Sequence, residues 1–264
     1  MASSPAPGTA GYVYPIGTPG SAWGVEERAQ WLARVGPPRR LYAEHVLAKL
    51  EPLREYFDVE QYGLLDYSGV VAGGLGARYP LMCVKSRGWS AEKPTILITG
   101  GVHGYETSGV QGVLDFVREK MGAFVDRANF LVAPCVSPWG YEHVQRWTCA
   151  ALDPNRGFHE GTEVEECAAL RRLIADSGAD FLMHVDCHET TNSDETEFTP
   201  AKQARDGKEY TPEAIPDGVR LNPPPAKPQV CSPPRAHPSP PPPPARSFTS
   251  WATPPTRSTR GTRR

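Results

Sequence analysis

The chain has 264 residues, a length that suits one large α/β domain or two small ones. Charge is spread unevenly: residues 222–264 hold 14 Pro, seven Lys or Arg and no acidic residue, which leaves 21 basic and 30 acidic residues elsewhere, a net charge of −9. An acidic body argues against nucleic acid as the main partner. No apolar run approaches the roughly 18 residues that a membrane-spanning helix needs, so we expect no membrane partner either.

Composition divides the sequence into three regions. Residues 1–24 are expected to form an extended arm, residues 25–221 an incomplete α/β domain, and residues 222–264 a disordered Pro/Arg-rich tail. The pentaproline at 240–244 has the form of a polyproline ligand for an aromatic-lined groove, although low-complexity sequence without a partner is the simpler interpretation. The first residues lack the pattern of a signal peptide and the six cysteines lack CxxC spacing, so we expect a cytoplasmic protein with reduced thiols.

Helical and strand-like segments alternate along the body. Residues 25–56 predict two helices broken at Gly36-Pro37-Pro38, and further helices are predicted at 106–121 and 163–176. Strands are predicted at 59–66, 79–85, 95–99, 129–135 and 181–187, with Gly73-Gly74 in a hairpin or loop. The last three strands are continuously apolar, which indicates a sheet covered by helices on both faces. Ligands bind at the carboxyl ends of such strands, so the segments that follow these three strands should carry the function.

The first of these segments is Gly-Gly-Val-His-Gly-Tyr-Glu, which contains His103 and Glu106 at the start of a predicted helix. A spacing of three residues lets an imidazole nitrogen and a carboxylate oxygen converge on one ion. The glycines allow a sharp turn and should leave space beside the metal. HxxE alone is common and usually marks a surface pair, but its place in a glycine-rich turn after a strand favours a metal site.

The second segment is His-Val-Asp-Cys-His-Glu-Thr-Thr, at the end of the strand 181–187. Strand alternation puts His184, Asp186 and His188 on one face and Cys187 on the other. His188 sits at the strand exit and is predicted as the third metal ligand, which gives the three protein ligands of a catalytic zinc site. Asp186 is expected to orient a ligand imidazole, and His184 to be a packed core histidine.

The third segment is Asp-Pro-Asn-Arg-Gly-Phe, in which Asn155 and Arg156 form a candidate clamp for a substrate carboxylate. Arg146, nine residues before Asn155, is a candidate for polarising a carbonyl or stabilising an oxyanion beside the metal. A solvated surface arginine is an equally open interpretation for Arg146.

Together and in this order, the three motifs resemble those of the carboxypeptidase A-like zinc peptidases and their succinylglutamate desuccinylase and aspartoacylase relatives. GVHGYE is similar to their HxxE element through His103 and Glu106, and DPNRGF to their D-x-N-R-x-F element through Asn155 and Arg156. DCHET is similar to D-x-H-x-T through His188. Each motif alone is weak, but the combination is specific.

The resemblance spans roughly residues 60 to 200. It implies an α/β fold with a mixed central sheet flanked by helices, one zinc ion per chain, and hydrolysis of an amide bond next to a free carboxylate. The implied partner is a peptide, or in the relatives an N-acyl amino acid, with a free carboxylate. Arg146 resembles the arginine upstream of Asn-Arg, which implies oxyanion stabilisation.

The sequence departs from this family after the third ligand. Family members continue with more sheet and a glutamate that acts as general base, whereas here the α/β composition is expected to end near Leu221. A frameshift, a mis-spliced transcript or a wrong gene model would produce such a change. Glu189, Glu195 and Glu197 are the nearest candidates for the base, but we expect them to be solvated loop residues. We therefore expect weak or absent hydrolysis with zinc affinity partly retained.

Two alternatives stay open. An amidohydrolase for N-acyl amino acids would use the same three metal ligands and the same water chemistry. A non-catalytic protein would retain the zinc or the carboxylate pocket, or would bind a partner through the proline run of the tail.

Overall fold

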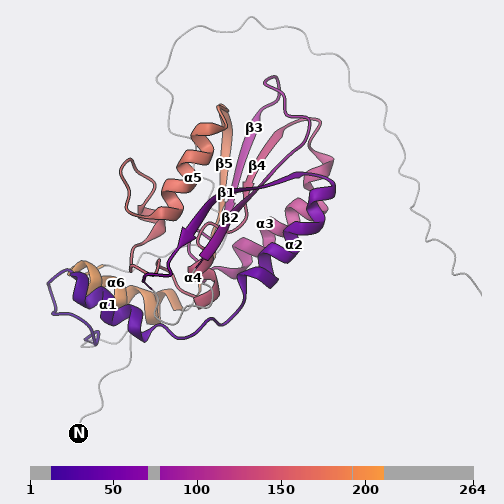
Figure 1. Ribbon diagram of the computed structural model, residues 1–264. Helices are drawn as coiled ribbons and strands as arrows, with labels where there is room; N and C mark the ends of the chain where they lie inside the picture. Colours follow the sequence, from indigo (N-terminus) through magenta and orange to yellow (C-terminus); the bar gives the residue numbers. More distant parts are fainter. Residues whose placement is uncertain (1–12, 71–77, 192, 211–264) are drawn as a thin grey trace, which may run out of the picture. The chain divides into compact units, whose positions relative to one another are not determined.

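The computed structural model describes residues 13–70, 78–191 and 193–210 (Figure 1). The predicted Gly73-Gly74 loop, most of the amino-terminal arm and the Pro/Arg-rich tail lie outside these described residues. Across the described ranges, no helix combines the length and apolarity needed to cross a bilayer.

A five-stranded mixed sheet forms the centre of the fold. Its strands are β1 (Asp58–Asp66), β2 (Arg78–Lys85), β3 (Thr95–Gly100), β4 (Asn129–Ala133) and β5 (Phe181–Cys187). Their order across the sheet is β1-β2-β4-β3-β5. β2 runs antiparallel to β1 and β4, while β3 runs parallel to β4 and β5. The carboxyl ends of β3, β4 and β5 therefore meet at one edge, where the first two motifs lie. The third motif, at 153–158, comes later in the connection that follows β4.

Gly and Pro residues separate the first two helical segments. The predicted break at 36–38 separates α1 (Val25–Arg34) from a continuous helical run made of η1 (Ala43–Leu47), α2 (Ala48–Leu50) and η2 (Glu51–Glu55). The predicted long helices are α3 (Thr107–Glu119), followed by η3 (Met121–Ala123), and α5 (Glu165–Asp176). Four short helices were not predicted: α4 (Pro138–His143), η4 (Pro154–Arg156), η5 (Asp194–Phe198) and α6 (Thr199–Asp206).

Helices cover both faces of the sheet. Strand alternation points Ile98 and Val132 into one apolar cluster with the α3 residues Val110 and Val113. The adjacent strand residues Leu97 and Leu131 point to the opposite face of the sheet. There they form a second apolar cluster with the α5 residues Leu170 and Leu173. Figure 1 shows α5 on one side of the sheet and α2 and α3 on the other. The predicted three-layer arrangement is confirmed.

The burial predicted for the strand 181–187 is wrong. β5 is an edge strand that pairs with β3 alone among the described strands. Leu182 is 60% exposed and Met183 37% exposed, and His184 is exposed as well, so His184 is not a packed core histidine. Coverage of this strand is partial: Val185 and Cys187 pack against the main core on the α3 side, and Phe181 packs against the cluster on the α5 side. An apolar run predicts a strand, but it does not state how many neighbours the strand has.

Candidate metal centre

The turn after β3 carries the first two predicted ligands. Gly101 has a φ of +63°, a conformation that favours glycine, and it lets the chain leave the strand sharply. A Cβ atom on Gly104 would lie 1.9 Å from the carbonyl carbon of Gly140, so the turn rests directly on α4. Gly104 therefore serves close backbone packing, and the predicted open space beside the metal is filled there by α4. His103 and Glu106 are each 2% exposed.

The Glu106 carboxylate lies between the two predicted histidine ligands. Its Oε1 atom is 2.8 Å from His103 Nδ1, and its Oε2 atom is 2.8 Å from His188 Nδ1. Burial acts to raise the pKa of Glu106, but the hydrogen bonds and charges of both imidazoles outweigh burial and hold that pKa below its usual range. The structure thus brings together three side chains from the ends of β3 and β5.

Each histidine presents its other nitrogen to a second carboxylate. His103 Nε2 lies 3.0 Å from Asp153 Oδ1, and His188 Nε2 lies 2.8 Å from Asp186 Oδ2. Such a carboxylate fixes the ring orientation and leaves the opposite nitrogen, here Nδ1, for an ion. Asp186 orients an imidazole as predicted. Sequence analysis did not assign this role to Asp153. The available signal was its position as the first residue of the DPNR motif, which was already a candidate for the site.

Thr99, inside β3, connects the exposed histidine to this arrangement. Its hydroxyl donates to Asp186 Oδ1 over 2.6 Å, and its Oγ1 atom is 2.8 Å from His184 Nε2. Because one hydroxyl of β3 contacts both side chains, His184 and Asp186 share a face of β5, as strand alternation predicts. No sequence signal marked Thr99, because the contact depends on the register between β3 and β5.

His188 is the most exposed member of the cluster, with a side chain that is 32% exposed. Burial opposes its protonation, but the hydrogen bonds and charges of Asp186 and Glu106 dominate and raise the pKa of His188 to about 10. The site is therefore rich in negative charge, which is the electrostatic environment that a divalent cation requires.

The donor set fits zinc. Zinc bonds to nitrogen and oxygen are about 2.0–2.2 Å long, so the ligands of a tetrahedral site lie roughly 3.5 Å apart. One ligand atom each of His103, Glu106 and His188 lies within 4.8 Å of the other two. Two imidazoles and one glutamate form a ligand set of catalytic zinc sites, and both imidazoles here already have orienting carboxylates.

Arg146 belongs to the same polar network. Its Nε atom is 3.5 Å from Asp153 Oδ2, and its Nη1 atom is 3.3 Å from both Asp194 Oδ1 and the Tyr105 hydroxyl. The side chain is only 17% exposed, so the alternative of a solvated surface arginine is wrong. Burial acts to lower the pKa of Arg146, but the charge of Asp153 and the neighbouring groups raise it, so the guanidinium stays charged.

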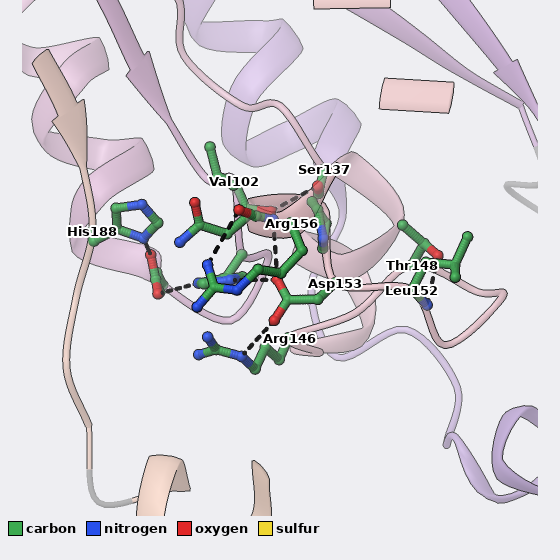
Figure 2. Close-up of polar contacts among 12 residues, drawn as sticks. Val102, Ser137, Arg146, Thr148, Leu152, Asp153, Arg156 and His188 are labelled. Carbon is green, nitrogen blue, oxygen red and sulfur yellow. Dashed lines mark hydrogen bonds and ion pairs between the residues drawn. The ribbon is translucent and has the colours of Figure 1, made fainter. Parts of the chain in front are cut away.

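The predicted carboxylate clamp lies on the short helix η4. Asp153 caps this helix, with its Oδ1 atom accepting the backbone N–H of Asn155 over 3.0 Å. Arg156 is exposed and forms no ion pair with any residue in the described ranges. In Figure 2 the side chains of Arg146 and Arg156 both extend toward the side of the site on which His188 lies. Arg156 also lines a cavity of about 650 Å³ that reaches Asp153 but none of the three candidate ligands.

The three candidate general bases, Glu189, Glu195 and Glu197, form no hydrogen bond or ion pair with the candidate ligands in the described residues. Glu189 Oε2 accepts hydrogen bonds from the backbone N–H and the hydroxyl of Ser108, over 2.8 and 2.9 Å, in the first turn of α3. Glu195 and Glu197 lie in η5 and are exposed. Glu189 is thus a helix-capping residue, and the expectation of solvated carboxylates holds for the other two.

Comparison with known proteins identifies the family of this chain. A family model for zinc carboxypeptidases matches residues 25–194, well over half of the chain. Carboxypeptidase 2 from Trichophyton tonsurans is 30% identical over 129 residues, which cover 44% of this chain but 23% of that protein. A solved metallo-carboxypeptidase from Burkholderia cenocepacia is 20% identical, covers 56% of this chain and 40% of its own, and superimposes with a TM-score of 0.45. The matched region contains the mixed sheet, the three candidate ligands, Arg146 and the 155–156 clamp, and the chain belongs to the zinc carboxypeptidase family.

Proposed function

We propose that this chain binds one zinc ion through His103, Glu106 and His188, in a site built for peptides that carry a free carboxylate next to the scissile amide bond. The observation that carries the proposal is the convergence of the three ligand side chains, with each imidazole oriented by its own aspartate. A chance cluster on a surface would not include a glutamate and a histidine that are each 2% exposed.

The side chains around the cluster have complementary roles in this proposal. When bound, zinc lowers the pKa of a coordinated water and so supplies a nucleophile at neutral pH. Asp153 and Asp186 hold the two imidazoles in place. Arg146 offers a buried positive charge where an oxyanion would develop. Arg156, which has no described ion-pair partner, offers its guanidinium to the substrate carboxylate, and the Asn155 amide would add a directional hydrogen bond.

We further propose that hydrolysis by this chain is weak or absent while metal binding is retained. The chain spans about a quarter of the length of the curated relatives it matches. Glu189 is engaged by Ser108, and Glu195 and Glu197 are exposed, so none of the three is placed as a general base by the contacts described above. Turnover comparable to that of a complete family member would contradict this part of the proposal.

Metal content of the purified protein tests the site. We expect about one zinc per chain in the parent and a large loss in His188→Ala. His184→Ala is the matched control, because His184 lies on β5 four residues before His188 and contacts Thr99 rather than any of the three ligand side chains. Equal metal content in the parent and His188→Ala would remove His188 from the ligand set.

A substrate panel tests the chemistry. Peptides with a free carboxyl terminus and N-acyl amino acids should be offered in parallel, because both are amides beside a carboxylate. We expect any activity to favour the peptides, and Arg156→Ala to raise KM more than it lowers kcat, since Arg156 contributes binding. Activity confined to N-acyl amino acids would move the assignment to an amidohydrolase within the same chemistry.

A further inference from the structure

A second arginine, distant in sequence from the metal motif, contacts the backbone of that motif. Arg40 lies between α1 and η1, and its guanidinium donates three hydrogen bonds. Nε donates to the carbonyl of Tyr141 over 2.6 Å, Nη2 donates to the carbonyl of Gly104 over 2.8 Å, and Nη1 donates to the Thr107 hydroxyl. The carbon at the centre of the guanidinium also stacks 3.6 Å from the centre of the Tyr141 ring.

Two of these acceptors flank a proposed zinc ligand. Gly104 precedes Glu106 by two residues and Thr107 follows it directly. Tyr141 belongs to α4, the helix on which the Gly104 turn rests. The planar guanidinium thus ties both ends of the Glu106 segment to α4, and the 104–107 turn cannot shift away from α4 without loss of one of these bonds.

The chemistry of the contact requires arginine. Arg40 is half-buried, and burial lowers the pKa of its guanidinium, so placing a cation here carries a desolvation cost. In the part of the chain that the structure describes, no carboxylate forms an ion pair with it. Its charge is met by two carbonyls, a hydroxyl and an aromatic face. A lysine would retain the charge but would not span three acceptors in one plane.

We propose that Arg40 is a positioning residue of the metal centre, which holds the 104–107 turn on α4 so that the Glu106 carboxylate stays between the imidazoles of His103 and His188. Arg40 touches none of the three ligand side chains itself and acts through the turn. The proposal rests on the zinc ligands proposed above.

The test compares Arg40→Met with Arg39→Met. Methionine keeps the apolar stem and removes the three donors, while Arg39 is the exposed neighbour and provides a matched loss of charge. Zinc dissociation constants are measured by competition with a chromogenic chelator, and the absorption spectrum of bound Co²⁺ reports ligand geometry. We expect zinc affinity to fall about 10–100-fold in Arg40→Met with a changed cobalt spectrum, and Arg39→Met to match the parent. Arg40→Lys should recover only part of the loss.

Two further measurements separate positioning from stability. Thr107→Val removes one acceptor and little volume, so it should fold even if Arg40→Met does not, and it should lower zinc affinity in the same direction by less. Unfolding of the chelator-treated protein gives the metal-free stability of every variant. A variant pair with lowered metal-free stability but parental zinc affinity and cobalt spectrum would show a purely structural role and would overturn the proposal.

A separate measurement distinguishes failure of the zinc site from failure of the positioning proposal. If the parent binds no zinc, the proposed function fails, and positioning is then read from the imidazole N–H resonances of His103, whose Nδ1 atom faces Glu106. Arg40→Met should shift or broaden these resonances, and Arg39→Met should leave them unchanged. Unchanged His103 resonances in Arg40→Met would overturn the positioning proposal even then.

Discussion

Among single residues outside the metal centre, Glu166 has the least ordinary environment. Its side chain on α5 is fully buried. The Tyr67 hydroxyl donates to Oε1 over 2.9 Å, and Oε2 has no hydrogen-bond partner among the described residues. Burial raises the pKa of Glu166 from 4.5 to about 7, because a charged carboxylate loses its hydration there.

This buried carboxyl predicts a pH dependence of stability. A folded-state pKa above the unfolded value means that the contribution of Glu166 is fully present below about pH 4.5 and is lost as pH rises through about 7. Glu166→Gln mimics the protonated form, so it should match the parent near pH 4 and exceed it at pH 8 by up to about 3 kcal/mol in free energy of unfolding. Urea denaturation at both pH values measures the difference.

Glu165→Gln is the matched control for this prediction. Glu165 is the preceding residue and is exposed, and its charge adds to the larger effect of burial on the pKa of Glu166. Its substitution should therefore retain the loss of stability toward pH 8 and move its midpoint slightly to lower pH. Identical pH profiles for the parent and Glu166→Gln would show that the carboxyl of Glu166 does not titrate in this range.

Sequence analysis identified candidate ligands where a short motif contains them at a fixed spacing. His103 and Glu106 are three residues apart on one turn, and His188 directly follows β5, so residue spacing and the end of a strand were sufficient to identify these candidates. Asp153 and Thr99 complete the site through contacts over 50 and 87 residues, to His103 and Asp186 respectively. Those contacts depend on strand order and register, which a single sequence does not encode locally.

At the scale of elements, α3 shows how two glycines of one helix have opposite roles. A Cβ atom on Gly109 would lie 2.3 Å from the carbonyl oxygen of Cys187 in β5. A Cβ atom on Gly112, three residues later, would have no atom within 4 Å. Gly109 therefore sets the close approach of α3 to β5, the strand directly before His188, and Gly112 faces open space.

Alanine at these two positions should have opposite effects. Gly112→Ala should stabilise the protein by about 0.5–1 kcal/mol, because alanine favours a helix and meets no obstacle. Gly109→Ala should destabilise it by about 1–3 kcal/mol and weaken zinc binding, because backbone must move at Cys187 beside His188. Chemical denaturation and chelator competition measure both effects. A stabilising Gly109→Ala would contradict the contact described between α3 and β5.

The elements that sequence analysis missed are short and locally ambiguous. The six residues of α4 are all buried, so they show none of the one-sided apolar pattern that identifies a surface helix. The long elements α3 and α5 and the strands β1 to β4 were predicted because their patterns repeat over several turns or fill a whole strand. β5 was predicted as a strand but with the wrong burial, because the edge of a sheet is a property of the whole assembly of strands.

For the molecule as a whole, the exposed edge of β5 is expected to promote self-association. Leu182 and Met183 are exposed on an edge strand, and exposed apolar edges promote self-association. Leu182→Lys should reduce self-association at high protein concentration and leave the thermal midpoint nearly unchanged, as measured by light scattering and thermal unfolding. Leu41→Lys, at a residue 46% exposed outside the sheet, is the control and should have little effect. Equal scattering from both variants would contradict a specific role for the β5 edge.

The separation of the ligands along the chain has a consequence for the order of folding. Glu106 and His188 are 82 residues apart, and they meet only after β5 has paired with β3. Closing that long loop carries an entropic cost before any ligand contact forms. A zinc ion that requires both residues would therefore bind only after β5 has paired with β3. Bound zinc would then mainly lower the rate of unfolding and would have little effect on the rate of folding.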